Sequence, residues 1–400
     1  MKILMLTPYL PYPPNSGGQV RSYNLIKNLA KKHQITLFSL IKEEKEKKYI
    51  KELKKYCRKI KVFYRSSKPW TVKNVLKTIF GVYPFLVIRN LSEEEKKAIE
   101  EELKKEKYDL IHAENFYVMP HLPKTSVPIL LTEQTILYKV FHHFVETLPW
   151  YLFFLKPFLM IDVWKLKYWE VYFWKKADWL TAVSVEDADF IKKISGRKDV
   201  EVVENGVDFN YFGKRIWKRK KIPTILFGAA DFHWLQNKEG AEILLKEIWP
   251  EIKNKLKNVQ LWIVGKIAPK VLSSWRGKED IIIEEIDDSR RAYQQSWVLV
   301  APMKSGGGSR TKFFEAMASG LPIITTSKGI EGIQVKNGQG VIIEDNCKKI
   351  VKKTINLILN PSEIEKIGNE GRKLVKLNYD WAKSAQKLNL VYEKIQKGKN

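Results

Sequence analysis

Three glycines followed by two cations and a carboxylate make the stretch SGGGSRTKFFEAMASGLPIITT, residues 305–326, the clearest candidate for chemistry in the chain. Glycine lets backbone N–H groups approach an anion closely, and the start of a helix adds a partial positive charge. Arg310 and Lys312 add full charges, of which the arginine fork suits phosphate oxygens. The pattern predicts a diphosphate site that combines both cations with a flanking loop, which contains Gly306, Gly307, Gly308 and Ser309.

Glu315 follows Lys312 by three residues, so both side chains lie on neighbouring faces of one helix. A carboxylate beside a diphosphate can accept hydrogen bonds from ribose hydroxyls, as acidic residues do in other nucleotide-binding folds. The alternative is a glycine-rich turn with a surface salt bridge between Lys312 and Glu315, because such loops are common. The spacing alone leaves both interpretations open.

A second glycine pair, Gly17 and Gly18, stands in TPYLPYPPNSGGQVRSYNLIKNLA between a predicted strand and a predicted helix. The pair lacks the G-x-G-x-x-G spacing, so a dinucleotide fingerprint is not supported. Its amides are candidates for contacting a donor phosphate, and a plain loop-to-helix turn is the other interpretation.

Both glycine segments follow runs of apolar residues that predict buried strands. In the first half of the chain the predicted strands are 2–7, 34–40, 59–64, 109–113, 127–133, 179–184 and 200–205. After a basic linker at 213–223 they are 224–229, 259–265, 280–285, 297–302, 321–326 and 340–344. Helical patterns between most of them predict an α/β fold of two doubly wound, Rossmann-like domains facing a central cleft.

Composition agrees with a two-domain globular protein, because 400 residues with 44% hydrophobic content exceed one ordinary core. The net charge of +26 favours anionic partners, although lysine-rich helices such as 42–55 and 92–107 also read as solvated surface. The cysteines, Cys57 and Cys347, give neither a metal spacing nor a disulfide framework. The opening MKILMLTPYLPYPP reads as a buried strand rather than a signal peptide, so we expect a cytoplasmic protein.

Several stretches together resemble family 4 of the retaining glycosyltransferases, which have the GT-B fold. These are KILMLTPYLPYPPNSGGQVRSYNLIKNLA, ADWLTAVSVEDADFIKK, VVENGVDFNYF, LFGAADFHWLQNKEG, LVAPMKSGGGSRTKFFEAMASGLPIITTSKGIEGI and NYDWAKSAQKLNLVYEKI. The resemblance covers nearly the whole chain, and residues 305–333 match the branch found in exopolysaccharide and cell-wall glycosyltransferases.

The resemblance implies an acceptor-side domain at 1–210, a nucleotide-sugar domain at 211–378 and a closing helix at 379–400 that crosses back to the first domain. It implies transfer of a sugar from a UDP- or GDP-linked donor to a saccharide or lipid-linked acceptor, without a cofactor or a metal. Arg310 and Lys312 would hold the diphosphate and stabilise its departure, while Glu315 would hold the ribose.

The first domain would touch the donor through Gly17 and Gly18. Near the position where many members have a histidine, DLIHAENF places His112 and Glu114 as candidates to face the sugar. A packed core histidine is the other interpretation of His112. The chain also has Gly307 where many members have the first of two glutamates, which leaves the identity of the donor sugar open.

Residues 137–179 form an insert rich in Trp, Phe, Tyr and Lys. Its longest apolar run, LPWYLFFL, is too short to cross a bilayer. Aromatic and basic residues together favour docking on an anionic membrane surface, at the inner face, and packing over the sheet is the alternative.

Two further functions remain open from the sequence. A nucleotide-sugar 2-epimerase of the same fold would use the donor without an acceptor. A basic, aromatic-rich chain could also be a non-enzymatic RNA- or membrane-binding protein, although no RNA-binding signature is present and we expect no specific nucleic acid partner.

Overall fold

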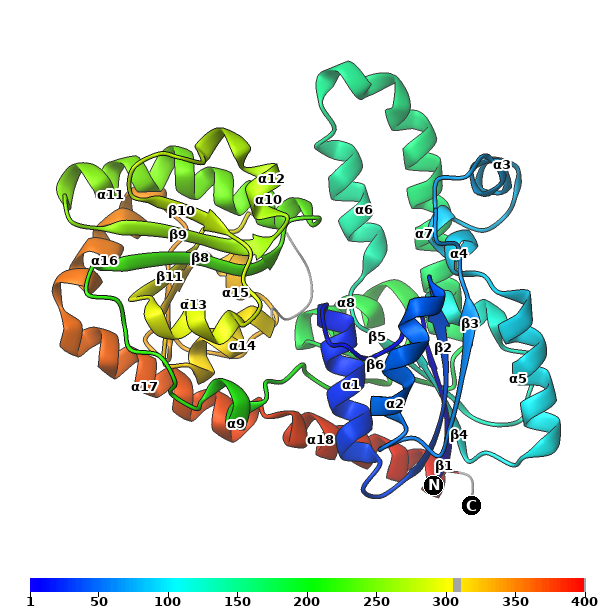
Figure 1. The fold of residues 1–400 in the computed structure, drawn as a ribbon. Coiled ribbons are helices and arrows are strands. Elements are labelled where there is room, and N and C mark those ends of the chain that lie inside the picture. Colours follow the sequence, from blue (N-terminus) through cyan, green and yellow to red (C-terminus); the bar gives the residue numbers. More distant parts are fainter. Residues whose placement is uncertain (305–310, 399–400) are drawn as a thin grey trace. The chain divides into compact units, whose positions relative to one another are not determined.

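A computed structural model describes residues 1–304 and 311–398 and divides the chain into two compact units. The first unit contains residues 1–204 and the last segment from residue 384, and the second contains residues 205–383 (Figure 1). The sequence placed the boundaries at 210 and 378. Each unit is an α/β domain with a fully parallel sheet covered by helices, so the predicted fold class is confirmed.

The first unit has a seven-stranded sheet in the order β3-β2-β1-β4-β5-β6-β7. Its strands are β1 (Lys2–Thr7), β2 (Gln34–Ile41), β3 (Lys59–Tyr64), β4 (Leu110–Glu114), β5 (Ile129–Glu133), β6 (Trp179–Ala182) and β7 (Val200–Val202). The interior strand β1 is buried from Ile3 to Thr7, because parallel sheets are covered on both faces.

The helices of the first unit include the complete predicted insert, as the antiparallel pair α6 and α7 joined through a short 3-10 helix, η3 (Figure 1). They are α1 (Gly17–Leu29), η1 (Glu44–Tyr49), α2 (Ile50–Leu53), α3 (Val72–Phe80), α4 (Phe85–Asn90), α5 (Glu93–Lys105), η2 (Phe116–His121), α6 (Leu137–Glu146), η3 (Trp150–Leu155), α7 (Lys156–Lys176) and α8 (Val185–Ser195).

The C-terminal helix α18 (Trp381–Lys397) belongs to the first unit from Ser384 onward. Its Tyr392 is fully buried and hydrogen-bonds His112 of β4 across 2.7 Å. Its Lys387 pairs with Glu204 at 2.7 Å. The last helix therefore returns to the first domain, as expected for the fold class.

The second unit has a six-stranded sheet in the order β10-β9-β8-β11-β12-β13. Its strands are β8 (Thr224–Asp231), β9 (Gln260–Lys266), β10 (Ile281–Glu284), β11 (Val298–Ala301), β12 (Ile323–Thr325) and β13 (Val341–Ile343). All thirteen predicted strands are present, with ends displaced by three residues or fewer.

The helices of the second unit cover both faces of this sheet. They are α9 (Phe209–Phe212), α10 (Leu235–Ile243), η4 (Leu244–Ile248), α11 (Trp249–Lys255), α12 (Ala268–Val271), η5 (Ser273–Trp275), α13 (Ser289–Gln295), α14 (Thr311–Ala318), α15 (Ser327–Ile330), α16 (Cys347–Leu359) and α17 (Pro361–Asn378). No helix or strand lies between Phe212 and Thr224, which agrees with the predicted linker.

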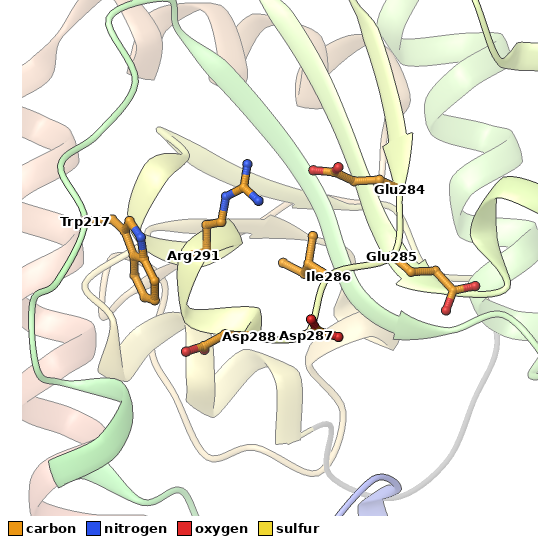
Figure 2. Close-up of a pocket in the computed structure, with 7 residues that line it drawn as sticks. All are labelled: Trp217, Glu284, Glu285, Ile286, Asp287, Asp288 and Arg291. Carbon is orange, nitrogen blue, oxygen red and sulfur yellow. The ribbon is translucent and has the colours of Figure 1, made fainter.

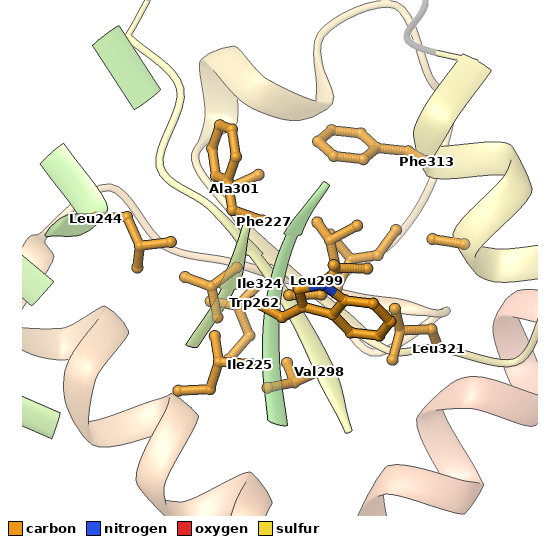
Figure 3. Close-up of a cluster of buried hydrophobic side chains, with 14 of the residues drawn as sticks. Ile225, Phe227, Leu244, Trp262, Val298, Leu299, Ala301, Phe313, Leu321 and Ile324 are labelled. Carbon is orange, nitrogen blue, oxygen red and sulfur yellow. The ribbon is translucent and has the colours of Figure 1, made fainter. Parts of the chain in front are cut away.

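The core of the second unit fixes α14 against the sheet. Phe313 of this helix is fully buried in the same cluster as Phe227 of β8 and Leu299 of β11 (Figure 3). Burying a side chain of this size stabilises a protein by about 2–3 kcal/mol. The apolar residues of α14 therefore hold the neighbouring Lys312 and Glu315 in defined positions.

Candidate functional site

Helix α14, which carries Lys312 and Glu315, lies at the point where the strand order of the second unit reverses. Strand β8 pairs with β9 on one side and with β11 on the other. The connection after β8 leads to β9 on one side of the sheet, and the connection after β11 leads to β12 on the other side. Ligands of open α/β sheets bind beyond the carboxyl ends of strands at such a switch point. Helix α10 follows β8 and α14 follows β11, so both begin at this edge.

Lys312 is held across the switch point by Asn237. Its ammonium donates to Oδ1 of Asn237 over 3.0 Å and lies 5.3 Å from the centre of the Phe227 ring. Asn237 in turn donates to the carbonyl of Asp231 at the end of β8 over 2.9 Å. These contacts position a cation at the first turn of α14, where an anion is also stabilised by the helix dipole.

Glu315, one turn further along α14, accepts a hydrogen bond from Tyr293. The Tyr293 hydroxyl, on α13, donates to Oε2 of Glu315 across 2.9 Å. Burial raises the pKa of Glu315 to about 7, and the hydrogen bond from Tyr293 acts in the opposite direction. An ionised carboxylate has about four acceptor positions, and Tyr293 occupies one of those of Glu315. The carboxylate can therefore accept hydrogen bonds from further hydroxyls.

Helix α13 also borders an open pocket of about 310 Å³. Figure 2 shows the side chains around it, which come from the carboxyl end of β10, from the loop between β10 and α13, from α13 and from the linker. The lining residues are Trp217, Glu284, Glu285, Ile286, Asp287, Asp288 and Arg291. Asp288 caps α13 and pairs with Arg290 at 2.5 Å, which fixes the rim of the pocket.

The glycine pair of the first unit lies at the equivalent switch point, because β1 stands between β2 and β4. Helix α1 begins at Gly17, where an added Cβ would meet nothing within 4 Å. At Gly18 an added Cβ would lie 2.0 Å from the Tyr9 hydroxyl and 2.8 Å from Oε1 of Gln134. Close packing therefore requires glycine at position 18 and leaves position 17 open.

His112 and Glu114 lie on the same face of β4, next to this helix start. Nδ1 of His112 hydrogen-bonds Tyr392 and Nε2 hydrogen-bonds Thr132, each at 2.7 Å. Burial lowers the pKa of His112 to about 3, with a further contribution from the charge of Arg21, so the ring is neutral. Both ring nitrogens are engaged, as in a packed core histidine.

Glu114 is the last residue of β4 and is fully buried. It accepts a hydrogen bond from Nε2 of Gln134, whose Oε1 accepts one from Tyr9 at 3.0 Å. Burial raises the pKa of Glu114, while the nearby positive charge of Arg21 lowers it. Tyr9, Gln134 and Glu114 thus form one polar chain at the carboxyl edge of the sheet.

Two family profiles match this chain and together cover both units. The profile described as Glycosyltransferase Family 4 matches residues 15–211, and the profile described as Glycosyl transferases group 1 matches residues 223–360. The chain belongs to glycosyltransferase family 4. The resemblance stated from the motifs is therefore confirmed.

Curated relatives of this glycosyltransferase are distant. An uncharacterized protein in the cps region of Klebsiella pneumoniae is 20% identical over 95% of this chain and 96% of its own length. An uncharacterized glycosyltransferase of Methanocaldococcus jannaschii is 22% identical over 55% of this chain, which spans 59% of that relative's length.

Solved structures share the fold over nearly the whole chain. A glycosyltransferase of Rickettsia africae has a TM-score of 0.66 and 17% identity, with 98% of both chains covered. HepE of Anabaena, solved in complex with UDP, has a TM-score of 0.64 and 13% identity, with 98% of this chain and 100% of that chain covered. At these identities the likeness shows the GT-B fold.

The site residues predicted for this glycosyltransferase fall into three groups. Lys312 and Glu315 lie on one short helix at the switch point of the second unit. Gly17, Gly18, His112 and Glu114 gather at the switch point of the first unit. Gly306, Gly307, Gly308, Ser309 and Arg310 lie outside the described residues.

Sequence reasoning missed the polar partners of the candidate site residues. Asn237 and Tyr293 contact Lys312 and Glu315, and Gln134 contacts Glu114. Asn237 stands in LFGAADFHWLQNKEG and Tyr293 in IIIEEIDDSRRAY, and each segment runs from a strand into a helix, which was the available signal.

Within residues 1–304 and 311–398 no group of three or more His, Cys, Asp and Glu side chains is arranged to hold a metal ion. Over the same ranges no helix of the glycosyltransferase has the length and apolar character needed to cross a bilayer.

Proposed function

We propose that this protein transfers a glycosyl group from a nucleotide-diphosphate sugar to a saccharide or lipid-linked acceptor in glycan synthesis, with retention of the anomeric configuration. The observation that carries the proposal is the pairing of Lys312 and Glu315 on α14 at the switch point of the second unit. One side chain supplies a cation for a diphosphate and the other a carboxylate for a ribose.

The chemistry that these residues support is stabilisation of a departing diphosphate. Negative charge grows on the β-phosphate as the bond to the sugar breaks, and fixed positive groups stabilise that charge in the transition state. Lys312 is held in place by Asn237, so little reorganisation is needed as the charge develops. Together with Arg310, it takes the part that a metal ion has in other transferases, and we therefore propose a metal-independent reaction.

The pocket beside α13 is the proposed site for the nucleotide base. It adjoins the helix that carries Tyr293, so the base pocket and the ribose carboxylate are linked through one element. HepE of Anabaena, which shares the fold, has been solved with UDP-glucose. We therefore propose a UDP- or GDP-linked donor, with UDP as the first to examine.

A transfer assay tests the proposed reaction. The protein is incubated with UDP-glucose and then with other nucleotide sugars, and with saccharide and lipid-linked acceptors, while proton NMR follows the anomeric signal. We expect an acceptor-dependent product with the configuration of the donor. An inverted product would refute retention, and donor turnover that gives an epimer without acceptor would replace transfer with epimerisation.

We also propose that the first unit docks on an anionic membrane surface through an aromatic platform. The platform consists of the exposed apolar side chains of residues 70–82 and 144–172. Trp70, Phe80 and Trp150 are 73%, 84% and 84% exposed. Monomeric soluble proteins rarely expose a large contiguous apolar patch, and such a patch marks an interaction site. Its members are Trp70, Val72, Leu76, Ile79, Phe80, Val82, Phe144, Trp150, Tyr151, Phe153, Phe154, Leu155, Phe158, Ile161, Trp164, Tyr168 and Tyr172.

The two segments of the platform are joined by specific contacts between α3 and α7. Lys165 donates to the carbonyls of Thr78 and Gly81, each at 2.7 Å, and so caps the end of α3. Trp169 donates its indole N–H to the carbonyl of Val82 over 2.9 Å. Residues 66–82 therefore extend the aromatic surface of the insert, although they lie far from it in the sequence.

Charge complementarity selects an anionic bilayer as the occupant of the platform. Residues 66–82 contain three lysines and no acidic residue. Residues 144–172 contain three acidic residues. Asp162 accepts a hydrogen bond from the backbone of Phe85 at 2.9 Å, Glu170 is buried and accepts one from the backbone of Leu137 at 2.8 Å, and the exposed Glu146 lies 3.3 Å from His142. Interfacial aromatic residues and lysines both favour the headgroup region of an anionic leaflet, as on the cytoplasmic side.

Vesicle sedimentation tests the docking proposal. Wild type should bind vesicles of phosphatidylcholine with phosphatidylglycerol more strongly than pure phosphatidylcholine, and Trp70→Ser/Phe80→Ser/Trp150→Ser should lose most of this binding. Leu359→Ser/Leu377→Ser, which changes two exposed apolar residues of the second unit, is the matched control. Equal binding by wild type and the triple variant would refute the platform.

A further inference from the structure

Two arginines of the first unit, Arg65 and Arg89, are held together at the carboxyl edge of its sheet. Arg65 directly follows β3, and its backbone N–H donates to the carbonyl of Ile41 at the end of β2 over 2.9 Å. Arg89 lies on α4, and its carbonyl accepts from the backbone N–H of Ser66 at 3.3 Å. This is the edge at which open α/β domains bind ligands.

The pair carries positive charge that the described part of the chain does not neutralise. Among described residues neither guanidinium lies in an ion pair, and Arg65 Nη1 donates to the neutral amide oxygen of Asn90 at 2.6 Å. The buried Nε of Arg65 has no hydrogen-bond partner. The negative charge of Glu46 favours the charged form of Arg65 and raises its pKa. The Glu46 carboxylate itself accepts hydrogen bonds from the backbone N–H groups of Lys42 and Glu43.

Electrostatics agree with this geometry. Burial lowers the pKa of both arginines, and the charge of Arg89 further lowers the pKa of Arg65. Burial raises the pKa of Tyr117 to about 12. The positive charges of Arg65 and Arg89 both act in the opposite direction and lower the pKa of Tyr117. Two half-buried like charges are costly unless an anion binds between them.

The arginine pair is connected to the aromatic platform by the segment between Arg65 and α3. Nδ2 of Asn74, on α3, donates to the Ser66 hydroxyl at 3.1 Å and to the Pro69 carbonyl at 2.9 Å. These bonds fix the segment that connects Arg65 to the exposed apolar residues of α3. A ligand that reaches both features has an anionic group and an apolar tail.

We propose that Arg65 and Arg89 bind the phosphate or diphosphate group of a lipid-linked acceptor, whose chain lies along the aromatic platform. This inference rests on the proposed glycosyl transfer, because it names the class of acceptor. Arginine forks suit phosphate oxygens, and the platform supplies apolar contact for the lipid.

Binding of farnesyl diphosphate, a short lipid diphosphate, tests the assignment on the full chain. The titration is made with and without saturating UDP, so that the donor site does not compete for the probe. Wild type should bind farnesyl diphosphate more tightly than farnesol. Arg89→Gln should weaken the diphosphate roughly tenfold or more and leave farnesol unchanged, because it removes charge-assisted hydrogen bonds.

Arg89→Gln is the primary variant because no hydrogen bond of the Arg89 side chain to another described residue is present. Arg58→Gln is the control, since Arg58 precedes β3 at the opposite edge of the sheet and pairs with Glu106 at 2.5 Å.

The inference would be overturned if wild type bound farnesyl diphosphate and farnesol with equal affinity. It would also be overturned if Arg89→Gln bound the diphosphate as tightly as wild type does. Loss of vesicle binding in Arg89→Gln would instead assign the pair to bilayer headgroups. Failure of UDP to bind would refute the donor site alone.

Discussion

Tyr293 donates its hydroxyl hydrogen to Oε2 of Glu315 over 2.9 Å, and this contact joins the two helices that border the candidate donor site. Tyr293 is buried, and burial raises the pKa of Glu315 to about 7. The carboxylate that would hold a ribose therefore changes charge near neutral pH. Burial is the larger cause of this shift, and the Tyr293 bond opposes it, because it favours the ionised form.

Donor affinity should fall as the pH is lowered through about 7, since only the ionised Glu315 accepts hydrogen bonds from both ribose hydroxyls. Below the pKa, each unit by which the pH is lowered should raise the Kd for UDP about tenfold. Calorimetric titrations at several pH values measure this slope. Glu315→Gln should bind weakly and without the slope, and an unchanged slope in that variant would assign the titration to another group.

Removing the Tyr293 hydroxyl should move the same transition to higher pH. Tyr293→Phe deletes the hydrogen bond that favours the carboxylate, so the pKa of Glu315 rises further. At a pH well above the transition the affinity for UDP should approach that of wild type. A loss of affinity that is equal at every pH would show that Tyr293 acts through packing rather than through the charge of Glu315.

Asn237 should be a positioning residue for Lys312. Asn237→Ala removes the acceptor that holds the ammonium at 3.0 Å, so the cation must be ordered by the ligand itself. We expect a Kd for UDP about tenfold higher or more, in line with the loss of one hydrogen bond to a charged group, about 1.5–3 kcal/mol. Asn254→Ala on the exposed surface of α11 is the control. Wild-type affinity in Asn237→Ala would contradict the role.

Gly18 and Gly17 should differ sharply in their tolerance of a methyl group. Gly18→Ala places a Cβ 2.0 Å from the Tyr9 hydroxyl, so Tyr9 and Gln134 must move, at a cost of about 1–3 kcal/mol in the free energy of unfolding. Gly17→Ala meets nothing within 4 Å and should be neutral or slightly stabilising. Thermal unfolding of the two variants checks this, and equal stabilities would contradict the packing around Gly18.

Chelation should leave turnover unchanged if fixed cations carry the charge of the leaving diphosphate. We expect the rate of sugar transfer to be the same in EDTA as in added Mg²⁺, while Lys312→Ala lowers it in both. Loss of activity in EDTA that Mg²⁺ restores would show that a metal ion takes part and would narrow the role proposed for Lys312.

The sequence was sufficient to predict the strands and to place the candidate site residues at the ends of those strands. Parallel strands buried on both faces are continuous apolar runs, such as KILMLT, and a switch-point site must lie at their carboxyl ends. The partners of site residues were not accessible in this way. Lys312 and Asn237 are 75 positions apart, and their contact depends on how α10 and α14 pack on neighbouring strands.

The aromatic platform shows the same limit. The insert at 137–179 could be recognised because its aromatic residues interrupt the strand pattern. Residues 70–82 form a short amphipathic helix and its flanks, which usually cover a core. The contacts of Lys165 and Trp169 of α7 with Thr78, Gly81 and Val82 join this segment to the exposed surface of the insert, and sequence separation hides them.

Calorimetric titration of UDP into wild type and Arg310→Ala/Lys312→Ala tests the proposed donor site most directly. We predict that wild type binds one UDP and that the double variant loses this binding while its thermal unfolding is unchanged. If UDP does not bind, GDP, ADP and dTDP follow in the same titration. Binding of no nucleotide by wild type, or equal binding by the double variant, would contradict a diphosphate site on α14.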